Sequence, residues 1–158
     1  MKFLIVFICL ALLCSCTGEV YIQTSKDTVL NYDYMKAIWL SQYDLLEIYT
    51  DGGAQREKKD FEKRINNVLD NVVSLGMNTV IVQVRPFADS MYPSEVYPMS
   101  YCVVGEYGAA ANYDPFEIIV SAAHERGLSV HAWVNPLRAM TDAEIQKIDR
   151  AFSIRKWY

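Results

Sequence analysis

The chain has 158 residues, in which 15 Lys and Arg stand against 19 Asp and Glu, giving a formal net charge of −4. Phosphate binding needs a basic face and no basic cluster is visible in the sequence, so no nucleic acid partner is expected. The length suits one domain, and with 52% hydrophobic residues the chain can bury a core.

The first residues predict an export signal. Lys2 precedes an unbroken apolar run over residues 3–14, which is shorter than the roughly 20 residues of a membrane span and typical of a secretory signal. The run ends in Leu13-Cys14-Ser15-Cys16, which resembles the lipobox of bacterial lipoproteins. The resemblance implies cleavage before Cys16 and lipid attachment to its sulfur. An ordinary signal peptide cut near Ser15 remains the alternative.

We therefore expect residues 1–15 to be a lipoprotein signal peptide, residues 16–34 a polar tether and residues 35–158 the folded domain. Lipid on Cys16 would hold the protein in the cell membrane or outer membrane, facing the periplasm or the exterior. Only Cys102 would then remain as a thiol in the mature domain, so no internal disulfide is expected.

Residues 35–41 read as a first strand, and residues 42–55 follow as a loop. A helix comes next, because apolar residues recur at spacings of three and four until Gly76, which is placed as a left-handed stop. The apolar stripe of that helix consists of Phe61, Ile65, Val68, Leu69, Val72 and Leu75.

Two later strands carry most of the functional information, at residues 79–85 and 128–134. Side chains alternate between faces along a strand, so each strand has one apolar face and one face that becomes polar toward its end. The apolar faces are Val80, Val82 and Val84, and Leu128, Val130, Ala132 and Val134. The opposite faces end in Gln83 and Arg85, and in Trp133 and Asn135. A proline follows each strand and favours its end there.

The segments between and after these strands also carry local signals. Residues 87–113 form a long connection without helical or strand periodicity, and such long loops tend to be functional. Asp114 and Pro115 start a helix as cap and first residue, and Gly127 ends it. Thr141 and Glu144 form a capping box, which predicts a helix that continues to about residue 152.

Strand and helix alternate three times, which predicts an α/β fold with a parallel sheet and right-handed crossovers. An open doubly wound sheet and part of an eight-stranded barrel both fit this order. The polar strand faces favour the barrel, because a central strand of an open sheet is covered by apolar helices on both faces. A barrel takes about 250 residues, so we expect about three βα units of a TIM-type (β/α)8 barrel, apparently incomplete.

Ordered motifs along the chain resemble the glycosyl-hydrolase-like family 10 domain. The motifs are residues 76–86, Asp89 with Tyr92-Pro93-Ser94, residues 113–115, residues 124–127 and residues 131–138. The resemblance covers about residues 35–158, the N-terminal part of the family domain. It implies a barrel of the triosephosphate-isomerase type, which is commonly carried by bacterial envelope lipoproteins. Some members cleave the glycan strands of peptidoglycan.

Five residues are predicted to bind glycan, and most have a structural alternative: Arg85, Asp89, Trp133, Asn135 and Arg138. Arg85 could grip a sugar hydroxyl or carboxylate through its planar fork, or form a salt bridge with Asp89. Trp133 could stack on a sugar ring or fill the core. Asn135 and Arg138 suit hydroxyl recognition or loop-stabilising hydrogen bonds.

Catalysis is harder to assign from these residues. Glycoside hydrolysis usually needs two carboxyl groups, and Asp89 is the one motif-matched carboxylate, so it is a candidate without a role. The resemblance implies acid residues on a fourth strand, beyond Tyr158. We therefore expect this chain alone to be inactive, with a non-catalytic lipid-anchored glycan-binding module as the alternative function.

No cofactor and no metal site are expected. The two histidines do not suggest a metal pair, because His124 lies on a helix and His131 on the following strand. A histidine inside a strand is more often a buried structural group, and His131 is interpreted in that way.

Overall fold

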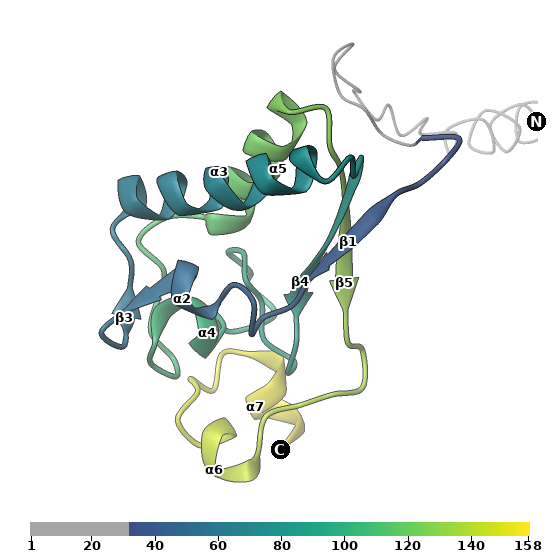
Figure 1. Cartoon of the computed structure of the whole chain (residues 1–158). Helices are drawn as coiled ribbons and strands as arrows, with labels where there is room; N and C mark the ends of the chain where they lie inside the picture. The colour runs from purple at the N-terminus through teal and green to yellow at the C-terminus, as the bar shows by residue number, and fades with distance from the viewer. Residues whose placement is uncertain (1–31) are drawn as a thin grey trace, which may run out of the picture.

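The computed structural model describes residues 32–158, so Cys16, the expected signal peptide and nearly all of the tether lie outside the described part. Its centre is a three-stranded parallel sheet in the order β1-β4-β5 (Figure 1). The strands are β1 (Ala37–Leu40), β4 (Thr79–Arg85) and β5 (Ser129–Val134). The predicted parallel α/β arrangement is confirmed.

Two long helices cover one face of this sheet, α3 (Lys58–Ser74) and α5 (Pro115–Glu125) (Figure 1). The expected signals position both helices. Gly76 follows α3 in the left-handed conformation with φ 72°, and the Asp114 carboxylate accepts N–H groups of Phe116 and Glu117 at the start of α5. The core between helices and sheet contains Phe61, Ile65, Leu69, Val72, Val80, Val82, Val84, Ile119 and Ala123.

The opposite face of the sheet has no covering helix in residues 32–158. Trp39 is 58% exposed, and its ring meets that of Trp133 edge to face with centroids 5.1 Å apart. His131 is exposed on this face, so the interpretation of His131 as a buried structural group is wrong. Its strand β5 pairs with β4 and lies at the edge of the sheet, where little covers the side chain.

The segment expected as a plain loop after the first strand is more ordered than predicted. It contains α2 (Leu46–Tyr49) and a small hairpin of β2 (Thr50–Asp51) and β3 (Ala54–Gln55). The buried Arg56 ties these elements together, because its guanidinium donates to the Glu47 and Thr50 carbonyls at 2.8 Å. It also pairs with Asp60 at 2.6 Å. These contacts depend on the tertiary arrangement of the segment and not on a periodic pattern of residues, so the sequence did not predict them.

The long connection after β4 is mostly irregular, as its composition predicted. A short helix, α4 (Tyr101–Val104), interrupts it, and Ser100 caps this helix by accepting the Cys102 N–H at 3.3 Å. Gly105 ends α4 with φ 74° and lies against the backbone of Gly53 at the tip of the β2-β3 hairpin. The loop is therefore packed onto the hairpin.

The C-terminal helix is shorter than predicted. The capping box of Thr141 and Glu144 is present, but α6 (Asp142–Ile145) ends after four residues, and α7 (Ser153–Trp157) follows separately. Asp149 accepts the Ala151 N–H at 2.7 Å and turns the chain between them. The turn brings Ile154 into a second apolar cluster, which consists of Ala88, Met140, Ile145, Ile148 and Ile154. No helix in residues 32–158 has the length and hydropathy to cross a membrane.

Candidate functional site

Hydrogen bonds through two side-chain amides, those of Gln83 and Asn135, join the carboxyl ends of the three parallel strands. The Gln42 N–H, just after β1, donates to Gln83 Oε1 at 3.0 Å, and Gln83 Nε2 donates to Asn135 Oδ1 at 3.0 Å. Side chains at the ends of parallel strands meet at one edge, which is where α/β proteins build sites. The strand alternation therefore correctly predicted the edge, whereas the partners of Gln83 became visible only in the structure.

Arg85 is held at this edge by the loops that follow the strands. Its Nη1 donates to the Tyr97 hydroxyl at 2.8 Å, and its Nη2 donates to the carbonyls of Asn135 and Pro136 at 3.5 and 3.3 Å. No ion pair within residues 32–158 involves Arg85, so the alternative of a salt bridge to Asp89 is wrong. Arg85 and Asn135 do lie together, as predicted.

Asp89 is a buried carboxyl group, only 3% exposed. Its Oδ1 accepts the Phe87 N–H at 2.8 Å. Burial raises the pKa of Asp89, and hydrogen bonds from Ser100 and the Phe87 backbone oppose the rise, as does the nearby charge of Arg85. The carboxyl group can therefore hold a proton at a higher pH than an exposed aspartate.

Asp89 lines a cavity of about 370 Å³ directly beyond the carboxyl ends of the strands. The walls come from the segments after β1 and β4, from α4 and from the segment around α6, which Figure 1 shows beyond the strand ends. The lining residues are Gln42, Tyr43, Leu46, Phe87, Asp89, Ser100, Tyr101, Cys102, Tyr107, Ala139, Met140, Thr141 and Glu144.

A second carboxyl group, that of Glu144, lines the same cavity, and its pKa is shifted in the opposite direction from that of Asp89. Its Oε1 accepts the Tyr107 hydroxyl, and its Oε2 accepts both the N–H and the hydroxyl of Thr141 at 2.8 Å. The hydrogen bond from Tyr107, followed by those from Thr141, lowers the pKa of Glu144. Glu144 is thus an ionised carboxylate whose two oxygens are already engaged.

The remaining predicted residues take different places. Arg138 lies over the ring of Phe87, with its Cζ 4.2 Å from the centroid, and so reaches the rim of the cavity. Trp133 lies on the uncovered sheet face with Trp39. The five predicted residues therefore fall into two neighbouring groups, one at the cavity with Asp89 and one along the strand ends.

Sequence reasoning missed most of the cavity wall. Gln42 lies two residues after Leu40, the end of β1, so the rule of polar groups at strand ends could have identified it. The contributions of Tyr101, Tyr107 and Glu144 depend on how the long loop and α6 fold back, and nothing in their spacing indicates that. Their convergence is a tertiary property.

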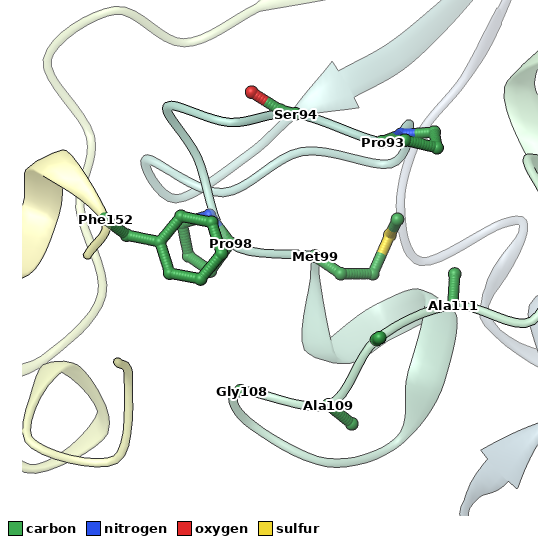
Figure 2. A pocket seen from close by; sticks show the side chains of 9 residues that line it. Pro93, Ser94, Pro98, Met99, Gly108, Ala109, Ala111 and Phe152 are labelled. Carbon is green, nitrogen blue, oxygen red and sulfur yellow. The ribbon is translucent and has the colours of Figure 1, made fainter. Parts of the chain in front are cut away.

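A smaller hollow of about 240 Å³ lies between the long connection and the start of α7 (Figure 2). Its walls are mainly proline, alanine, Met99 and Phe152, without a charged side chain. It offers no group for chemistry. Within residues 32–158 no cluster of three metal-ligating side chains occurs either.

Comparison with known proteins identifies the family to which the chain is similar. A family model described as glycosyl hydrolase-like 10 matches residues 34–152. The chain is 33% identical to glycosyl hydrolase YngK of Bacillus subtilis (strain 168) over 123 residues, which cover 77% of this chain and 24% of that protein. It is 32% identical to glycosyl hydrolase DigH of Escherichia coli (strain K12) over 116 residues, which cover 70% and 26%. The chain spans about a quarter of the length of these curated relatives.

Proposed function

This chain belongs to the glycosyl hydrolase-like 10 family, as its motifs predicted, and on that premise we propose that it acts on glycan in the cell envelope. The observation that carries the proposal is the polar edge of the sheet, where Gln83, Arg85 and Asn135 meet beside a cavity with a buried carboxyl group. Hydroxyl groups of a saccharide need such closely placed donors and acceptors. Peptidoglycan strands are the proposed substrate.

The proposed architecture is the first three βα units of a (β/α)8 barrel. Two features support it: all three strands are parallel, and their order in the sheet follows their order in the chain. A doubly wound sheet reverses its strand order at a switch point, and these strands do not. Trp39, Ile81 and Trp133 would face the barrel interior, which accounts for their place on the uncovered face.

The proposed location is the bacterial envelope, through lipid on Cys16. The support is the lipobox-like segment of residues 13–16. Expression in a bacterium should place the protein in the membrane fraction, and Cys16→Ala should release it. A wild-type protein that is already soluble in the periplasm or the medium would contradict the proposal.

A hydrolase needs a proton donor and a second carboxylate. Asp89 suits the donor, because burial favours its protonated form. The second role has no free candidate in the cavity, since both oxygens of Glu144 are engaged. This engagement favours one alternative function, a lipid-anchored module that binds glycan without cleaving it.

The experiment that separates these functions uses the full chain and peptidoglycan strands stripped of their peptides. Release of reducing ends would support hydrolysis, binding without release would support the module, and neither would contradict both. Arg85→Ala and Trp133→Ala should weaken binding several-fold, because each removes a group at the strand ends. Trp157→Ala is the matched control, since Trp157 is 69% exposed on α7.

A further inference from the structure

The cavity beyond β1 and β4 contains a buried polar atom without a partner. Gln42 is 1% exposed, and its backbone N–H is bonded to Gln83, yet its side-chain Oε1 has no hydrogen-bond partner among residues 32–158. A buried amide oxygen left without a donor destabilises the folded protein, because it has lost its hydration without gaining a hydrogen bond. The Gln42 side chain is part of the cavity wall, so a group bound in the cavity is a candidate donor to this oxygen.

Asp89 supplies a second buried polar group to the same cavity. Its Oδ1 is bonded to the Phe87 N–H, and Ser100 hydrogen-bonds the carboxyl group. Burial raises the pKa of Asp89, so its carboxyl group can donate as well as accept. Gln42 and Asp89 together therefore match a ligand whose groups both donate and accept hydrogen bonds. Hydroxyl groups have this property.

The rest of the cavity is largely apolar and aromatic. Leu46, Phe87 and Met140 contribute apolar wall. Tyr43 and Tyr101 stand at the exposed side, 68% and 43% accessible, and Tyr101 is held by stacking on Tyr107 with centroids 4.9 Å apart. A sugar ring presents C–H faces to aromatic rings and hydroxyl groups at its edge, so it fits this combination of walls and polar groups.

We propose that the cavity is a saccharide subsite in which Gln42 Oε1 and the Asp89 carboxyl group hydrogen-bond the hydroxyl groups of one sugar unit. The inference rests on the proposed action on glycan and adds the position of one subsite and two of its residues.

The test measures binding of two β-1,4-linked tetrasaccharides, one of N-acetylglucosamine and one of glucose, to the full chain by isothermal titration calorimetry. Gln42→Met keeps the side-chain length but removes the unpartnered oxygen, and it should weaken binding roughly tenfold. Gln146→Met is the matched control, because Gln146 is exposed just after α6 and does not line the cavity. This variant should bind both sugars as wild type does. The two sugars show whether acetamido groups are recognised.

Cys102 provides a second measurement that needs no variant. Its side chain lines the cavity, so bound sugar should slow its alkylation several-fold, read by mass spectrometry of the peptide that contains it. Binding to wild type without protection of Cys102, or with equal affinity for Gln42→Met, would overturn the subsite while leaving the proposed function intact. If neither sugar binds, both the subsite and the proposed function are overturned.

Discussion

Asp89 is the residue in which burial, hydrogen bonding and position at the cavity combine. A carboxyl group that is 3% exposed loses hydration when it ionises, so its neutral form is favoured. The Ser100 hydroxyl and the Phe87 N–H limit that effect without cancelling it. The motif indicated that Asp89 matters, but only the structure shows that it is buried.

Asp89 should therefore give the protein a specific dependence of stability on pH. Because its folded pKa lies above its unfolded value, the folded state binds more protons, and this contribution is complete below about pH 4 and lost as pH rises through the folded pKa. Chemical denaturation of wild type and Asp89→Asn across pH 3 to 8 measures it. The wild-type free energy of unfolding should fall relative to that of the variant as pH rises. A constant difference would contradict the raised pKa.

At the same scale, sequence reasoning placed the polar residues of the strand ends but not their partners. Alternation put Gln83 and Arg85 on one face, because the period of a strand is a local property. The bond from Gln83 to Asn135 spans two strands, and the bond from Arg85 to Tyr97 spans a loop. Such pairs depend on register and loop path, which residue spacing does not encode.

Two glycines at the ends of elements have different structural roles. Both Gly76 and Gly105 have positive φ, at 72° and 74°. A Cβ on Gly76 would meet nothing within 4 Å, whereas a Cβ on Gly105 would lie 1.9 Å from the Gly53 carbonyl oxygen. Gly105 is thus required both by its own conformation and by the contact of α4 with the hairpin.

Gly105→Ala should accordingly destabilise the protein more than Gly76→Ala. Left-handed backbone costs a non-glycine residue about 1–2 kcal/mol, which applies to both variants. The clash with Gly53 should add about 1–3 kcal/mol at position 105. Denaturant titration measures both free energies of unfolding. Equal losses would show that the hairpin moves away freely.

The start of α5 offers a separate test of a local signal. Asp114 accepts two backbone N–H groups there, so Asp114→Ala should cost about 1 kcal/mol of stability. Asp114→Asn retains an oxygen acceptor in the same place and should cost much less. Calorimetric unfolding of both variants measures the difference. A similar loss in both would mean that charge, rather than capping, is responsible.

Sequence signals predicted elements well where the signal and the structure were both local. Helical spacing located α3, although Leu75 is 62% exposed and does not belong to its buried stripe. The capping box marked where α6 begins but carries no information about where it ends. The chain turns after Ile145 and brings Ile154 into the second apolar cluster, a contact that the capping box does not encode.

The whole molecule has one covered and one uncovered sheet face in residues 32–158. Its outer strands, β1 and β5, each have a single sheet neighbour there. Unpaired strand edges and exposed apolar faces promote association. The sheet face covered by the long helices carries apolar residues, whereas the uncovered face carries aromatic and polar ones.

The open edge of β5, together with the uncovered sheet face, predicts self-association of the full chain. Val134, which is 47% exposed on the edge strand β5, lies where a second chain would pair. Val134→Lys should reduce association, because charge on an edge strand disfavours pairing. Sedimentation analysis over a range of concentrations measures it. Val73→Lys is the matched control, since Val73 is 43% exposed on α3 and should change little. A monomer at all concentrations would contradict this prediction.

The edge-to-face contact of Trp39 and Trp133 makes this surface optically distinctive. Two indole rings with centroids 5.1 Å apart and planes at 88° are held in one fixed orientation, so they should contribute to the near-ultraviolet circular dichroism. The third tryptophan, Trp157, is 69% exposed on α7. The tryptophan emission thus comes from residues outside the main core, and any partner that covers the open sheet face should shift it.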